Sequence, residues 1–175
     1  MKIDVLPIIR DHFGTLRDAR TEKYSVVDFA LFYGLPLVSA SVPFVWRIKL
    51  DDSFYSLSIT FFGIFIALLL NVQVAIFGIF QRKWDRPEDD NLAVLQNEKL
   101  EERRILLGEL NANLSYMVLF SCISLVAFLI FTVFNVMSVL IAAATVAIYI
   151  HFVLTLMMAV KRAHTLFQME YEGHV

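Results

Sequence analysis

The sequence predicts an all-α integral membrane protein. The expected fold is a four-helix bundle of four transmembrane spans, with an N-terminal amphipathic helix and a helical cytoplasmic extension of the third span. Hydrophobic residues make up 58% of the 175 residues and charged residues only 18%, whereas soluble domains average roughly 45 to 50% and about 25%. Four long stretches are almost free of charge, and basic residues gather on one side of them. These observations argue against a soluble globular protein.

The four apolar stretches together hold 91 residues and cover 26–46, 57–80, 114–134 and 136–160. Each is long enough to cross a bilayer, since about 20 helical residues span roughly 30 Å of hydrocarbon. The remaining segments are each about 35 residues or shorter, which is too short for a catalytic domain of roughly 100 residues. We therefore divide the chain into an N-terminal segment, a four-span domain with a charged helical loop, and a tail, at 1–25, 26–160 with the loop at 81–113, and 161–175.

The distribution of positive charge predicts the orientation of the chain. Thirteen of the fifteen Lys and Arg residues lie before the first span, in the middle loop or in the tail. Loops rich in Lys and Arg stay in the cytoplasm. We therefore expect an integral protein of a bacterial inner membrane with both its N-terminus and its C-terminus cytoplasmic, and with its protein partners on that side.

The segment before the first span has an apolar stripe at helical spacing, formed by Ile9, Phe13 and Leu16. Charged residues occupy the other faces, and Pro7 suits a first helical turn. This pattern predicts an amphipathic helix. Two interpretations stay open: the helix lies on the lipid surface, or its apolar face packs under the protein's own bundle.

The third span is predicted to begin well before the membrane. Pro87 and the acidic residues after it favour a helix start, and a continuous helix from Pro87 to Phe134 would measure about 72 Å. A heptad-like seam within it is expected to pack against another helix, within the chain or in a partner or second copy; a surface helix and a break at Gly108 are the alternatives. The candidate contact residues are Leu100, Arg103, Leu107 and Leu110.

The first span is the one most expected to bend. Proline removes a backbone hydrogen bond and clashes with the preceding turn. The candidate hinge residues are therefore Gly34, Pro36 and Pro43. The bends either act as hinges or simply give the span its shape.

Polar side chains inside the spans are the candidates for a functional site, because they are costly in hydrocarbon. Asn71 and His151 lie at the same depth when counted from the ends of their spans, so we expect a hydrogen bond between them, within one chain or across an oligomer. Gln73 lies nearby. Such a group is either a packing contact or a pore-lining or proton-sensitive site. Asp28, two residues into the first span, has either an interfacial role or a functional one.

The sequence lacks the motifs of several classes of enzyme and of nucleic-acid-binding proteins. The sequence has no phosphate-binding glycine loop, zinc-protease pair or nucleophile elbow. Its single cysteine, Cys122, permits no intramolecular disulfide. With a net charge of −2 there is no basic footprint for nucleic acid. We expect no enzymatic activity, no catalytic residue, no metal, no cofactor and no direct nucleic-acid binding.

The expected function is that of a non-enzymatic, homo-oligomeric membrane subunit that contacts lipid and engages a cytoplasmic protein. In its number of spans the chain resembles small four-span bacterial proteins encoded beside antiviral systems, such as the membrane partner in Kiwa-type defence and accessory proteins near CRISPR effectors. That resemblance implies a role as a membrane sensor or as a permeabilising component. The alternatives are a homo-oligomeric ion channel or small transporter, and a lipid-acting membrane enzyme with an interfacial pocket of convergent titratable groups.

Overall fold

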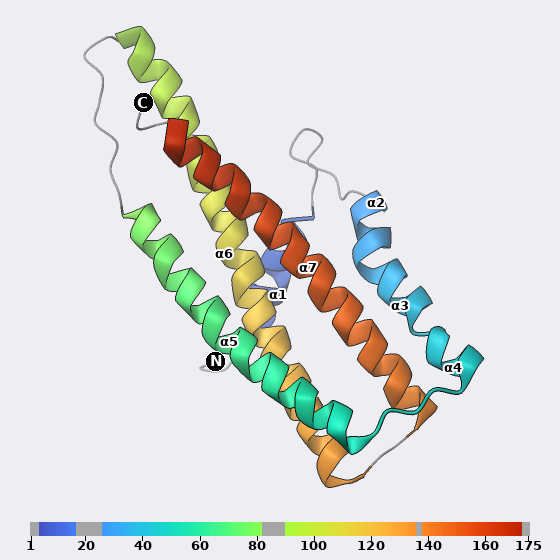
Figure 1. The fold of residues 1–175 in the computed structure, drawn as a ribbon. Coiled ribbons are helices and arrows are strands. Elements are labelled where there is room, and N and C mark those ends of the chain that lie inside the picture. Colours follow the sequence, from blue (N-terminus) through green and yellow to red (C-terminus); the bar gives the residue numbers. More distant parts are fainter. Residues whose placement is uncertain (1–3, 17–25, 82–89, 136–137, 173–175) are drawn as a thin grey trace.

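The computed structural model describes residues 4–16, 26–81, 90–135 and 138–172, and every regular element in them is a helix (Figure 1). In chain order these are α1 (Leu6–Gly14), α2 (Val26–Phe29), the π-helical segment η1 (Ala30–Gly34), α3 (Leu35–Ser39), α4 (Val42–Trp46), α5 (Asp52–Phe80), α6 (Asp90–Val133) and α7 (Val139–Glu172). Four segments are long and apolar enough to cross a membrane: Val26–Trp46, Asp52–Phe80, Asn97–Val133 and Val139–Tyr171. The four-span, all-helical prediction is confirmed at that level.

The long helices lie side by side, and α7 lies between the α5–α6 pair and the broken first span (Figure 1). One end of the bundle, the loop end, holds the end of α4, the start of α5, the end of α6 and the start of α7. At the opposite end, the tail end, α2 begins and α5 and α7 finish. The short link after α6 includes Asn135, whose left-handed φ of 48° turns the chain back. The carboxylate of Asp51 caps α5 by accepting a 3.0 Å hydrogen bond from the amide of Phe54.

The first span is broken where its prolines predict. The π-helical segment η1 ends at Gly34 and precedes Pro36, and a turn at Ala40 and Ser41 separates α3 from α4 just before Pro43. Proline has no N–H to continue the helical ladder, which accounts for the change of helix type at these points. The bends are therefore part of the span's shape; whether they also act as hinges stays a prediction.

Aromatic rings fill the centre of the bundle. Tyr55 and Phe62 of α5 stack with Phe128 of α6, and Phe152 of α7 meets Phe62 edge to face at a centroid distance of 5.3 Å. All four side chains are buried. Aromatic burial of this kind holds the three long helices together.

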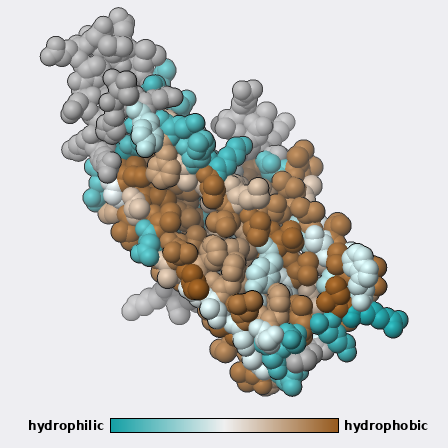
Figure 2. All heavy atoms as spheres, in the orientation of Figure 1, coloured by the Kyte–Doolittle hydropathy of each residue, from teal (hydrophilic) through white to brown (hydrophobic). Residues whose placement is uncertain are grey.

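The outer surface is apolar over most of the length of the spans. Figure 2 shows hydrophobic side chains across the middle of the molecule and hydrophilic ones gathered toward its two ends. Large apolar residues of all four spans are exposed, among them Phe44, Leu68, Ile123 and Met157. Soluble monomers rarely expose apolar surface of this extent, whereas a protein whose spans contact lipid must have an apolar outer surface.

The long helix predicted for the third span is present as α6, an uninterrupted helix of 44 residues. The start expected at Pro87 lies outside the described residues. Gly108 lies within the helix, so the alternative of a break there is wrong.

Candidate functional site

The structure gathers polar side chains where α1 docks against α6 and α7. Counting about 20 residues, or roughly 30 Å, from the loop end brings α5 to Gln73, α6 to Asn113 and α7 to Ala159. This level is tied together by side chains, because Gln73 Nε2 donates to Ser115 Oγ over 2.8 Å. The polar cluster described below therefore lies near the boundary between the spans and the part of the bundle beyond them.

In the first part of the cluster, two side chains contact one residue of α6, Asn113. His12 belongs to α1, and Thr15 lies in the turn that ends this helix. His12 is fully buried, and its Nδ1 lies 2.8 Å from Oδ1 of Asn113. Since an amide oxygen only accepts, this ring nitrogen carries the proton. The hydroxyl of Thr15 lies 3.0 Å from the same oxygen and 2.7 Å from the backbone oxygen of His12, and its single proton serves these two acceptors. Asn113 is thus the residue that fixes α1 on α6.

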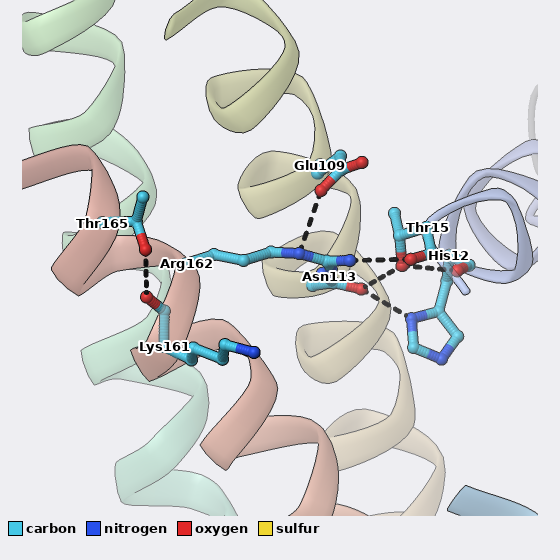
Figure 3. Close-up of polar contacts among 7 residues, drawn as sticks. All are labelled: His12, Thr15, Glu109, Asn113, Lys161, Arg162 and Thr165. Carbon is cyan, nitrogen blue, oxygen red and sulfur yellow. Dashed lines mark hydrogen bonds and ion pairs between the residues drawn. The ribbon is translucent and has the colours of Figure 1, made fainter. Parts of the chain in front are cut away.

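A charged residue from α7 closes the cluster. Figure 3 shows Arg162 reaching between α6 and α1, where Nε pairs with Glu109 Oε2 at 3.0 Å and Nη2 donates to the backbone oxygen of Thr15 over 2.7 Å. The charge of Asp28 in α2 also interacts with Arg162. The guanidinium of Arg162 therefore links α7, α6 and the C-terminal turn of α1, and it is also attracted by the negative charge of Asp28 in α2.

An aromatic stack connects this cluster to the interior of the bundle. The ring of His12 lies 3.8 Å from that of Tyr116, with only 3° between their planes. The hydroxyl of Tyr116 is 2.8 Å from Nε2 of His151, whose Nδ1 donates to the backbone oxygen of Phe32 over 3.1 Å. In a regular helix that oxygen would accept from position 36, but Pro36 has no N–H to donate. The segment around Phe32 is π-helical, and a histidine of α7 donates to its backbone oxygen there.

Three polar atoms of the cluster are buried without a hydrogen-bond partner among the described residues: Nε2 of His12, Nδ2 of Asn113 and Nη1 of Arg162. Burial lowers the pKa of His12 from 6.5 to about 4, and the positive charge of Arg162 acts in the same direction, while the bond to Asn113 opposes it. The imidazole is therefore neutral near pH 7, and the cluster keeps unused hydrogen-bonding capacity.

The four predicted polar residues do not form one site. Both ring nitrogens of His151 are bonded to other groups, and Asn71 is exposed on the outside of α5, so the expected hydrogen bond between them is wrong within the chain. Equal depth did not place them on facing sides of their helices. Gln73 pairs with Ser115 instead, and Asp28 is exposed at the start of α2.

The predicted seam of α6 also requires a correction. Arg103, Leu107 and Leu110 are buried inside the chain, and Leu100 is half-buried beside them. Arg103 pairs with Glu170 of α7 and donates to the backbone oxygen of Ile79 in α5. The seam therefore packs within the chain, and its buried residues are not available as partner or oligomer contacts.

Sequence reasoning missed most of the cluster. His12, Asn113 and Arg162 lie in the segments that the sequence predicts to be the amphipathic helix, the charged helical loop and the tail. One signal was present: His12 interrupts the apolar stripe of α1 next to Phe13. Only the docking of α1 on α6 shows that this histidine is buried.

Comparison with known proteins does not extend these findings, because no protein-family model, curated protein or solved structure matches this chain. Within the described residues no group of His, Cys, Asp or Glu side chains is arranged to hold a metal ion. The class that the fold defines is a helical protein with four segments long and apolar enough to span a membrane.

Proposed function

We propose that the chain is a non-enzymatic subunit of a homo-oligomeric assembly in a bacterial inner membrane, and that it engages a cytoplasmic protein through its tail end. The charge distribution supports this orientation, because thirteen of fifteen basic residues lie before the first span, in the middle loop or in the tail, which the alternation of four spans assigns to one side of the membrane. The loop end offers only two short connections. A protein partner therefore has most surface to contact at the tail end.

The observation that carries the proposal is a rigid extension of α6 and α7 beyond the expected membrane level. The buried pair of Arg103 and Glu170 fastens the two helices together there. One turn apart on the outer face of α7, Phe167 and Tyr171 are 49% and 80% exposed. Exposed aromatic residues on a rigid element are typical anchors of protein interfaces. This pair replaces the buried seam as the candidate partner contact.

The role of that partner contact follows from the resemblance in span count. A membrane sensor or permeabilising component of an antiviral system needs a subunit that is held in the membrane and reports to a protein in the cytoplasm. The docking of α1 supports a sensing role, because α1 lies near the expected membrane boundary and its docking includes the buried side chains of His12 and Asn113.

No described residue specifically favours the channel alternative. Asn71 is exposed on the outside of α5 while His151 is enclosed by aromatic rings, so the three residues expected to line a pore share no surface. The enzyme alternative required an interfacial pocket with convergent titratable groups. A groove of that kind exists between α1 and α6, but it holds no metal-binding group and its hydroxyl groups are hydrogen-bonded elsewhere.

The test is purification in a mild detergent, followed by measurement of the mass of the complex and identification of the proteins that accompany it. We expect an oligomer with a cytoplasmic protein bound. The double variant Phe167→Ser, Tyr171→Ser is expected to lose that protein. Phe134→Ser, which alters an exposed phenylalanine at the loop end, should retain it. A monomer with no accompanying protein would contradict the proposal.

A further inference from the structure

A groove of about 800 Å³ lies between α1 and α6, just beyond the level of Asn113. Its wall includes two basic and two acidic side chains that point from facing helices, Arg10 and Asp11 of α1, and Glu101 and Arg104 of α6. Neither arginine has an ion-pair partner among the described residues. The wall of the groove therefore carries both positively and negatively charged side chains, and neither sign is in large excess.

A second, apolar recess of about 340 Å³ lies on the other side of α6, against the end of α5. Ile76, Phe77 and Phe80 contribute its apolar wall. The two hollows share Arg104, Gly108 and Asn111. These residues are four and three positions apart and so lie on one face of α6. The charged groove and the apolar recess thus meet along a single stripe of the helix.

Because Gly108 has no side chain, no atoms project from α6 at the centre of this stripe. A Cβ atom at this position would meet no heavy atom within 4 Å. Glycine in the interior of a helix costs about 1 kcal/mol relative to alanine, and no close packing at Gly108 requires it. Open space over the glycine joins the two hollows.

We propose that this surface binds one phosphatidylethanolamine molecule. Its phosphate lies between Arg10 and Arg104, its ammonium group lies against Asp11 and Glu101, and an acyl chain follows the apolar recess between α5 and α6. The groove runs along α6 from Ser115, at the expected boundary of the spans, to Glu101 beyond it, so a phospholipid headgroup at that boundary enters the groove from its near end. This site is independent of the proposed protein partner.

The charges select this headgroup over the other common ones. A primary ammonium group donates charge-assisted hydrogen bonds to carboxylates, as the ammonium of lysine does. The quaternary ammonium of phosphatidylcholine has no N–H to donate. Phosphatidylglycerol has a phosphate but no cation, so it would leave both carboxylates facing an anion. Glu109 takes no part, because it pairs with Arg162.

The experiment is native mass spectrometry of the full-length protein in detergent, with each of the three lipids added separately at equal concentration. We expect one phosphatidylethanolamine to be retained at concentrations about ten-fold below those needed for the other two, the effect of about one charge-assisted hydrogen bond. Equal retention of all three lipids, or a preference for phosphatidylglycerol, would overturn the proposal.

Two variants locate the binding. Gly108→Leu should fill the stripe and weaken phosphatidylethanolamine retention at least about ten-fold, and Arg104→Gln should weaken it similarly through loss of the phosphate contact. Gly78→Leu is the matched control, because Gly78 is also exposed in a helix with nothing within 4 Å but does not line either hollow. If Gly108→Leu and Arg104→Gln both bind phosphatidylethanolamine as the unaltered chain does, the lipid lies elsewhere and the proposal fails.

Discussion

His12 shows how one residue decides where an element lies. Its ring is fully buried, stacks on Tyr116 and donates to Asn113. A protonated His12 would be less stable in this site than a neutral one, because burial disfavours the charge and the positive charge of Arg162 repels it. The docking of α1 therefore depends on a neutral histidine.

We predict that acid weakens this docking. The pKa of His12 is about 4 when docked and near 6.5 in a free imidazole, so the undocked form takes up a proton first as the pH falls. The stabilisation is complete above pH 6.5 and is lost progressively toward pH 4, by about 3 kcal/mol at most. Thermal unfolding in detergent between pH 4.5 and 7.5 measures the effect.

The control for this prediction is His12→Phe, which keeps a ring to stack on Tyr116 and removes the titration. Glu109, Glu170, Asp28 and His151 also titrate or carry charge near the cluster, and they remain in the variant. A pH dependence that is equal in the two proteins would mean that these groups, and not His12, control the acid sensitivity.

At the scale of elements, the first span shows how a distorted part of one helix contacts another helix. Pro36 cannot supply the N–H that a regular α-helix would direct at the oxygen of Phe32, and the segment there is π-helical. Nδ1 of His151 donates to this oxygen over 3.1 Å, so the distorted part of the first span is also a point of contact with α7. This contact also defines the tautomer of His151, since Nδ1 must carry the proton.

We predict that Pro36→Ala disturbs the tautomer of His151. The restored amide favours a regular α-helical turn with a bond to the oxygen of Phe32, and straightening this turn moves that oxygen away from Nδ1 of His151. The ¹⁵N NMR spectrum of the labelled histidine should show the Nδ1–H form in the unaltered protein and a mixture in the variant. Pro43→Ala is the control, because it restores an amide in the same span outside this contact; an identical change in both variants would contradict the prediction.

At the scale of the whole molecule, the distribution of surface polarity determines which way the chain lies in a membrane. The apolar surface in Figure 2 covers the middle of the molecule, and the charged residues of α6 and α7 extend beyond it at the tail end. Burying this apolar surface in lipid is favourable, while the charges stay in water. The orientation then depends on the positive charge at the tail end.

We predict that a membrane-impermeant maleimide labels the loop end from outside the cell and the tail end only after the membrane is opened. The background is Cys122→Ser, which removes the single native cysteine. Ser53→Cys reports on the loop end and Thr165→Cys on the tail end, and both positions are exposed. The reverse pattern of labelling would show that the charge rule fails for this chain.

Much of the architecture was predictable from the residues because it depends on local properties. Length and hydropathy identify the spans, proline positions locate the breaks, and the absence of helix breakers in α6 predicts its continuity. The site was less predictable. Depth could be counted along each span for Asn71 and His151, but their rotation about the helix axes could not, and it is rotation that separates them.

The sequence alone determined four apolar helices, their alternating direction and the side expected to carry most positive charge. Each of these follows from the hydropathy or the charge of consecutive residues. Only the tertiary structure decided that the α6 seam lies inside the chain, that α1 docks through His12, and that Arg162 joins three helices. These results depend on which faces of separate helices meet. Side-chain packing between distant segments selects those faces, and no local pattern along one helix records it.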